Sequence, residues 1–139
     1  LARQYNYYPT NVDVQLAHDW VADNYVDLFG PMMSALVFEK DPAAKAEKQE
    51  KFFSMQLPTF MNQVCKYINS PGRWLFGDKI CAADFMVGRL YTDYMCDPMG
   101  PCHDKFKQCL SNCPEFERYG QQFAAEMADY LAKRPKTPF

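Results

Sequence analysis

Long hydrophobic runs are missing from this chain of 139 residues, and so is an excess of charge of either sign. No apolar stretch reaches the roughly 18 residues that a membrane-spanning helix needs, so we expect no membrane span. The 15 Lys and Arg residues balance 17 Asp and Glu residues to a net charge of −2, and they are scattered along the chain. Without a basic stripe to follow a phosphate backbone, we expect no nucleic-acid partner.

Signals for β-strands and for several common catalytic motifs are also missing. The chain has no Asn-Gly or Asp-Gly pair and no clear alternation of polar and apolar residues, which argues against β-hairpins. It has no glycine-rich phosphate loop and no H-E-x-x-H zinc motif. Its two histidines, His18 and His103, have no nucleophile and acid arranged around them, so we predict no catalytic residue in this chain.

Helical periodicity is the main positive signal. Pro31 and Pro58 fall inside the first two predicted helices and should bend them, because proline removes a backbone donor. On the last predicted helix, Tyr130 is expected on the inner face. Helices joined by short loops predict an all-α bundle of about five helices. The predicted helices are residues 12–38, 42–69, 82–95, 102–110 and 115–133.

The start of the third predicted helix carries a capping motif. Asp84 lies three residues after Cys81, where its carboxylate can accept from the Cys81 backbone N–H. Ile80 precedes the cap and Phe85 lies one turn into the helix, so the two can form a hydrophobic staple. We therefore predict a structural capping motif made of Ile80, Cys81, Asp84 and Phe85.

The six cysteines allow several interpretations. Cys96, Cys102, Cys109 and Cys113 crowd one stretch, but only the last two have a spacing typical of zinc ligands, so we expect no metal site. A chain with a full apolar core and no secretory signal favours reduced thiols over a disulfide framework. Cys81 stands at a predicted helix N-terminus, where the backbone N–H groups could lower its pKa; the alternative is a buried, inert cap.

A row of carboxylates lies along the first predicted helix. Asp19, Asp23 and Asp27 follow one another at intervals of four residues and therefore share one helix face. Taken by themselves, these residues favour a solvated acidic face. A divalent metal site would need more oxygen ligands than this spacing provides.

The stretch R-W-L-F-G-D at 73–78, followed by A-D-F at 83–85, resembles the F-L-x-G-D-x-x-S/T-x-A-D-F pattern of cytosolic glutathione S-transferases. The pattern belongs to their C-terminal helical domain, and Cys81 replaces the usual Ser or Thr. Residues 1–8 resemble the end of the preceding thioredoxin-like domain or its linker, and residues 133–139 resemble the basic tail of sigma-class members. The resemblance implies an all-helical C-terminal domain over residues 9–139, cut from a longer protein.

The resemblance also implies a function. In that family the catalytic residue and most glutathione contacts lie in the thioredoxin-like domain, so this part would not catalyse conjugation alone. Asp27, with Asp23 as the second choice, is expected to contact glutathione held by the other subunit of a homodimer. Phe29 and Met33 are expected to line the hydrophobic pocket, and the alternative for these two is packing in the core or at the dimer interface. Glutathione would be a co-substrate, with no cofactor, in a cytoplasmic protein. The alternative is a non-catalytic, transferase-like scaffold in a larger complex.

Overall fold

The computed structural model describes residues 1–68 and 72–135. Within these residues every regular element is helical, and the only β-type pairing is an isolated bridge between Trp74 and Gly77. The predicted all-α fold class is therefore confirmed. The elements are α1 (Val12–Met33), η1 (Ser34–Phe38), α2 (Pro42–Lys51), η2 (Phe52–Gln56), α3 (Leu57–Ile68), α4 (Ala82–Arg89), η3 (Leu90–Met95), α5 (His103–Ser111), α6 (Pro114–Glu126) and α7 (Ala128–Lys133), where η marks a π-helical turn.

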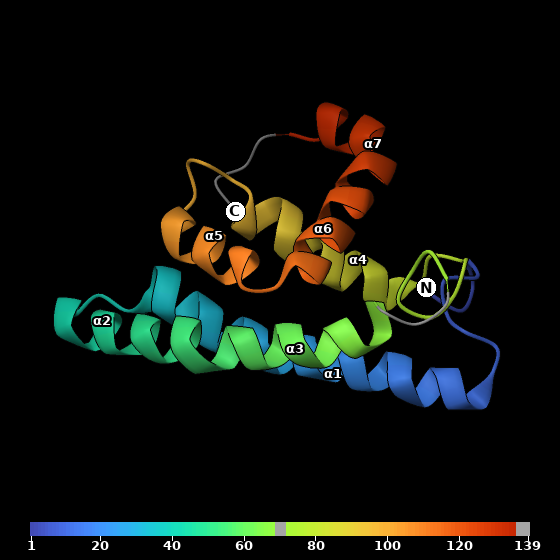
Figure 1. The fold of residues 1–139 in the computed structure, drawn as a ribbon, viewed down its shortest axis with the longest axis horizontal. Helices are drawn as coiled ribbons and strands as arrows, with labels where there is room; N and C mark the ends of the chain where they lie inside the picture. The colour runs from blue at the N-terminus through green and yellow to red at the C-terminus, as the bar shows by residue number, and fades with distance from the viewer. Residues whose placement is uncertain (69–71, 136–139) are drawn as a thin grey trace.

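The helices form two groups. Figure 1 shows α1, α2 and α3 in one long layer, with α4, α5 and α6 on one side of it and α7 beyond α6. The core between the groups is apolar, and its largest fully buried side chains include Phe52, Phe106 and Phe116. The predicted end of the second helix at residue 69 and the tail from 136 to 139 lie outside the described residues.

The two prolines inside helices do not end them. Helix α1 continues through Pro31 and then changes to π-helical winding in η1, where the Glu39 N–H donates to the Ser34 carbonyl at 3.1 Å. The second π-helical turn, η2, ends at Gln56, two residues before Pro58, with the Leu57 N–H donating to the Phe52 carbonyl. A π-helical turn therefore lies within three residues of each of these prolines, which cannot donate a backbone hydrogen bond.

The last predicted helix is interrupted. Helix α6 ends at Glu126, Met127 has φ −92° and ψ 9°, and the chain resumes as the short helix α7. Tyr130 is 63% exposed, so the expectation that it faces the core is wrong. The reason is that Met127 is the last side chain of this segment that packs against the core, which leaves no apolar layer for Tyr130 to cover.

Two glycines allow α4 and η3 to pack closely against α6. A Cβ added to Gly88 would overlap the ring of Phe123, and one added to Gly120 would overlap the ring of Tyr91. Each glycine thus receives an aromatic ring from the opposite segment. The close approach fixes the position of α4, which carries the residues described below.

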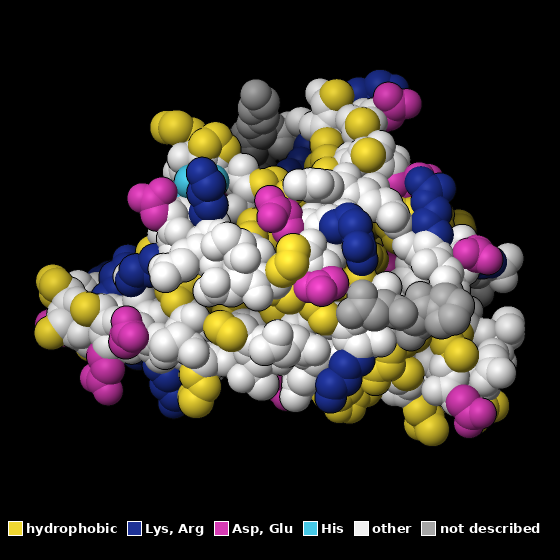
Figure 2. Space-filling view, viewed as in Figure 1, with side chains coloured by type: hydrophobic (Ala, Val, Ile, Leu, Met, Phe, Trp, Pro, Cys, Tyr) yellow, Lys and Arg dark blue, Asp and Glu magenta, His cyan; other side chains and the backbone are white. Residues whose placement is uncertain are grey.

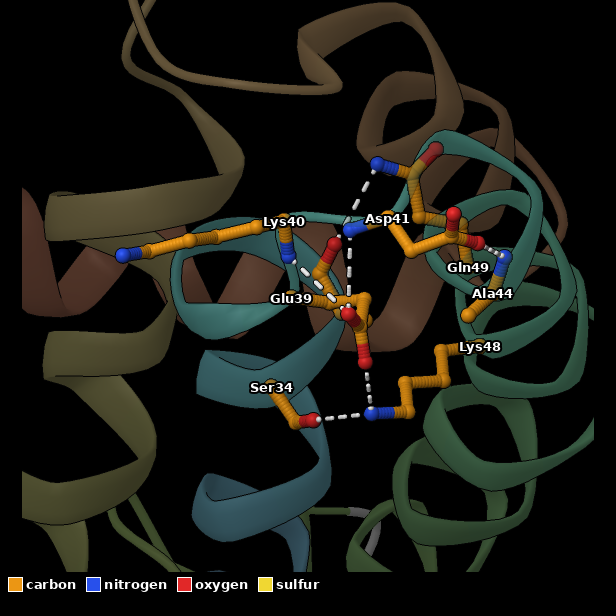
Figure 3. A network of polar contacts seen from close by, with 8 residues as sticks. Ser34, Glu39, Lys40, Asp41, Ala44, Lys48 and Gln49 are labelled. Carbon is orange, nitrogen blue, oxygen red and sulfur yellow. Dashed lines mark hydrogen bonds and ion pairs between the residues drawn. The ribbon is translucent and has the colours of Figure 1, made fainter.

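A polar network holds the turn between η1 and α2 (Figure 3). The Glu39 carboxylate accepts from the backbone N–H groups of Lys40 and Asp41 at 3.0 and 3.1 Å and pairs with the Lys48 ammonium. Lys48 also donates to the Ser34 hydroxyl at 3.1 Å. The bond to Lys48 is the main reason that the pKa of Glu39 lies below its ordinary value. This network at the surface therefore stabilises the turn between η1 and α2.

The face of the molecule seen in Figure 2 shows no concentration of one charge. In Figure 2, Lys and Arg side chains are interspersed with Asp and Glu across the face in view. Among the described residues, none of the helices combines the length and the apolar character needed to cross a membrane.

Candidate functional site

The N-terminus of α4 is organised by a buried carboxylate. Asp84 is fully buried, and its Oδ2 accepts from the Cys81 N–H at 2.8 Å. Its Oδ1 accepts from the Leu75 N–H at 3.0 Å and from the Tyr119 hydroxyl at 2.6 Å. Burial, followed by the nearby Asp84 charge, raises the pKa of Tyr119 well above its ordinary value. The carboxylate therefore joins the turn before α4, the helix itself and α6.

The next backbone donors of α4 find partners in distant parts of the chain. The Ala82 N–H donates to the Tyr7 carbonyl at 2.8 Å. The Ala83 N–H donates to Nε2 of His18 at 3.3 Å, and His18 is a buried side chain of α1. Because the first N–H groups of a helix have no partner within the helix, these bonds replace a local cap.

His18 is fixed on its other side as well. Its Nδ1 lies 2.9 Å from Oδ1 of Asp19, so with Nε2 accepting from the helix, Nδ1 carries the proton and donates. Asp19 also accepts from the Tyr8 hydroxyl at 2.7 Å. The bonds from Tyr8 and then His18 lower the pKa of the Asp19 carboxyl. This chain of contacts ties residues 1–8 to the helical domain.

Cys81 does not have the lowered pKa that its place at a helix N-terminus suggested. Burial, and then the adjacent Asp84 carboxylate, raise the pKa of its thiol to about 12. The hypothesis of a reactive thiolate is therefore wrong, because loss of solvent outweighs the helix N–H groups. Both halves of a capping box between Cys81 and Asp84 are present. Ile80 and Phe85 pack against the core, and Phe85 meets the ring of Tyr7 edge-on at 5.2 Å.

A cavity of about 450 Å³ lies beside the same helix start. Tyr25 of α1 is 8% exposed, and its hydroxyl is buried without a hydrogen-bond partner in the described structure. Burial raises the pKa of this hydroxyl to about 12, so it remains a donor at neutral pH. A buried, unpaired donor at an apolar wall suits a ligand that offers an acceptor. The lining residues are Leu1, Ala2, Tyr5, Tyr7, Tyr25, Ala82, Phe85, Met86 and Arg89.

Sequence reasoning missed this cavity, because its walls come from three separate segments. Phe29 and Met33, the predicted pocket residues, are not in its lining; both are half-buried and pack against the core. Phe29 lies next to the cavity, with its ring centroid 6.1 Å from that of Tyr25 and 6.4 Å from that of Tyr94.

Asp23 and Asp27 lie on the exposed face of α1. Neither carboxylate has a hydrogen bond or ion pair within residues 1–68 and 72–135, unlike Asp19. Asp27 follows Tyr25 by two residues, which is about 200° around a helix, so it points away from the cavity of its own chain. Any ligand that it contacts must therefore approach from the outer side of α1.

The cysteines of residues 96–113 are spread over different environments. Cys96 is exposed and Cys102 is half-buried, while Cys109 and Cys113 are buried. In the part of the chain that the structure describes, no three His, Cys, Asp or Glu side chains are grouped to hold a metal ion.

Comparison with known proteins agrees with this architecture. The family model described as "Glutathione S-transferase, C-terminal domain" matches residues 26–134. No curated protein matches the chain. Rat hPGDS complexed with a quinoline superposes with a TM-score of 0.70 at 19% identity, covering 94% of this chain and 61% of that chain. NaGST1 gives 0.79 at 17% identity, and NaGST-2 gives 0.65 at 19%, each covering 99% of this chain and 66% of that chain. The chain thus spans about two thirds or less of these solved chains.

Proposed function

The chain belongs to the glutathione S-transferase family through its C-terminal domain, and from this we propose that it is the helical half of an enzyme that conjugates glutathione to hydrophobic electrophiles. The reacting thiolate and the group that activates it would belong to the thioredoxin-like half. The helical half would supply the floor of the electrophile pocket and a contact to glutathione across a homodimer. This division of roles rests on the family membership and on two features of the structure.

The cavity beside α4 carries the proposal. Its walls are mostly apolar, and the lining side chains that can donate to an oxygen are those of Tyr5, Tyr7, Tyr25 and Arg89. Of these, the Tyr25 hydroxyl is the one that is buried without a hydrogen-bond partner in the described structure. An aromatic or unsaturated electrophile with a carbonyl or nitro oxygen would bury its body against Phe85 and Met86. Its oxygen would accept from Tyr25, satisfying a donor that is otherwise unpaired.

The same pocket would extend along α1. Phe29 touches the Tyr25 ring, and Met33 follows one turn later on the same side of the helix. Met33 adapts readily to ligands of different shape because its side chain is unbranched and polarizable. We therefore retain Phe29 and Met33 as the outer part of the pocket wall, next to the cavity.

The outer face of α1 supports the dimer part of the proposal. Leu16, Trp20 and Val26 are exposed apolar side chains on this face, at 69%, 38% and 62%. A second copy covering them would bring its own glutathione towards Asp27. A free carboxylate there can bind the γ-glutamyl ammonium through a charge-assisted hydrogen bond. Asp23, one turn earlier, is the second candidate for this contact.

The pocket is tested by filling it. Met86→Trp should occupy much of the cavity and raise the KM for a hydrophobic electrophile about tenfold, with the KM for glutathione changed less than twofold. The assay is steady-state kinetics of the purified protein that contains both halves. Met55→Trp, at an exposed position outside the cavity, is the matched control. Equal KM values for the electrophile in the two variants would show that the cavity is not part of the electrophile-binding site.

The contact across the dimer is tested by charge removal. Asp27→Asn should raise the KM for glutathione about tenfold, because a charge-assisted hydrogen bond contributes roughly 1.5–3 kcal/mol. Asp23→Asn, at the second candidate, should raise it less than Asp27→Asn does. Asp13→Asn, at an exposed position in the first turn of α1, is the control and should change it less than twofold. If glutathione-agarose fails to retain the intact protein while it stays bound to a large assembly, the scaffold alternative replaces the enzyme.

A further inference from the structure

Two buried cysteines from different helices meet far from the proposed pocket. Cys65 lies near the end of α3, and Cys113 is the residue that precedes α6. Their sulfur atoms are 3.0 Å apart, although the residues are separated by 48 positions in the sequence. Both thiols are reduced in the structure, at 9% and 7% exposure. Packing of α3 against α6, which Figure 1 shows, is what brings them together.

A second cavity gives access to one of the two. It has a volume of about 470 Å³, lies between η2, α3 and α5, and includes Cys113 but not Cys65 in its lining. Cys109 also lines it, but the Cys109 thiol lies 3.7 Å from the Phe53 carbonyl, to which it donates. A small reagent that enters this cavity therefore reaches the pair through Cys113.

We propose that Cys65 and Cys113 are an oxidative modification site, a dithiol that hydrogen peroxide converts to a disulfide linking α3 to the start of α6. The proposal is independent of the transferase activity. A disulfide needs a separation of about 2.05 Å, so the sulfurs have to approach by about 1 Å. This shift is small because α3 and α6 are already in contact.

The reaction balances in two steps. The Cys113 thiol first releases its proton. The resulting thiolate attacks one peroxide oxygen, the O–O bond breaks, and Cys113 becomes a sulfenic acid while the departing hydroxide takes up the released proton as water. The Cys65 sulfur then attacks the sulfenic sulfur, the S–O bond breaks, and the departing hydroxide takes the Cys65 proton as a second water. Two thiols lose two electrons in total, and one peroxide accepts them.

The order of the steps follows from the surroundings. Burial, and then the neighbouring Cys113, raise the pKa of Cys65 to about 12, so this thiol keeps its proton at neutral pH. Peroxide reacts with thiolates, and it enters from the cavity on the Cys113 side. Cys113 is therefore the residue oxidised first, and Cys65 is the residue that resolves it.

The test is peroxide treatment of the purified protein, followed by non-reducing digestion and mass spectrometry. We expect a linked peptide pair containing Cys65 and Cys113, with the loss of two hydrogens, that disappears after reduction. Closing this long loop should also raise the Tm of the oxidised protein by on the order of 10 °C. The pair should form in Cys96→Ser, which removes an exposed cysteine, and should be absent in Cys65→Ala and Cys113→Ala.

Trapping with a sulfenic-acid reagent separates the two steps. In Cys65→Ala, Cys113 should accumulate as the trapped sulfenic acid, and in Cys113→Ala, Cys65 should not. If a variant fails to fold, the proposal is still tested in the wild-type protein, by the linked peptide and by the Tm of the oxidised form compared with the reduced form. The proposal is overturned if both thiols can still be fully alkylated when the peroxide-treated protein is unfolded. It is also overturned if Cys113 is recovered linked to Cys109.

Discussion

Helices α1 and α2 begin in a different way from α4. The first two are capped locally, by the Asn11 side chain accepting from the N–H groups of the next turn and by Asp41 accepting from the Ala44 N–H at 2.8 Å. Helix α4 starts at Cys81, whose thiol is a weak acceptor, and its donors are satisfied by Asp84 and by residues from elsewhere in the fold. A local cap belongs to one helix, whereas the cap of α4 holds several segments together.

The largest expected difference between these caps is in stability. Asp84→Ala would leave the Cys81 and Leu75 N–H groups and the Tyr119 hydroxyl buried without their acceptor, and should lower the free energy of unfolding by roughly 3–5 kcal/mol. Asp41→Ala removes an exposed local cap and should cost about 1 kcal/mol. Urea unfolding of both variants measures this. Similar losses would mean that the cap of α4 is no stronger than a local one.

An intermediate effect is expected at alkaline pH. The Cys81 thiol has an ordinary pKa of 9.0 and a folded pKa of about 12, so the folded state favours the protonated thiol. Its contribution is complete below pH 9 and is lost as the pH rises towards 12, at up to about 1.4 kcal/mol per pH unit. Unfolding from pH 8.5 to 11 should therefore show a shallower decline for Cys81→Ala than for the wild type.

Asn11→Ala is the matched control for the alkaline series, because an Asn cap does not titrate. It should lower stability by a similar amount at every pH and leave the alkaline slope unchanged. A slope that Cys81→Ala does not alter would show that other groups govern the alkaline loss.

The smallest effect is expected from restoring the oxygen cap. Cys81→Ser should raise the free energy of unfolding by about 0.5 kcal/mol, since a hydroxyl caps better than a thiol but loses some apolar contact at this buried site. Thermal unfolding should show an increase of roughly 2 °C. Cys81→Ala removes both contributions and should lower the Tm. A Tm for the serine variant at or below that of the wild type would contradict the capping interpretation.

The helices were predictable because their signals are local. Apolar periodicity and the breaks at proline and glycine predicted residues 12–38, 82–95 and 102–110, and the start of 42–69, close to their observed bounds. The break at Met127 was not predicted, since the periodicity continues through it. The helix breaks where the rest of the fold no longer offers an apolar surface for it to cover. No local sequence pattern indicates that position.

The site was predictable only in part, because its residues meet through distant packing. The Asp84 bond to Cys81 spans three residues and can be read from the sequence. The bond from Ala83 to His18 spans 65 residues, and the sulfur contact between Cys65 and Cys113 spans 48. The unpaired hydroxyl of Tyr25 is visible only when every neighbouring acceptor is known. The roles of Asp27, Phe29 and Met33 remain predictions.

The π-helical turns have a consequence for insertions and deletions. Each of η1, η2 and η3 directly follows an α-helix and bonds its last residues five positions apart, as between Cys96 and Tyr91. Removing one residue from such a turn can restore ordinary α-helical winding without shortening the hydrogen-bonded ladder. The side chains after the turn then point in the same directions as before. A deletion within α3, in contrast, would rotate all later residues of the helix by about 100° around its axis. Within the described helices, these three turns are therefore the places where one residue can be removed with the least damage to the core.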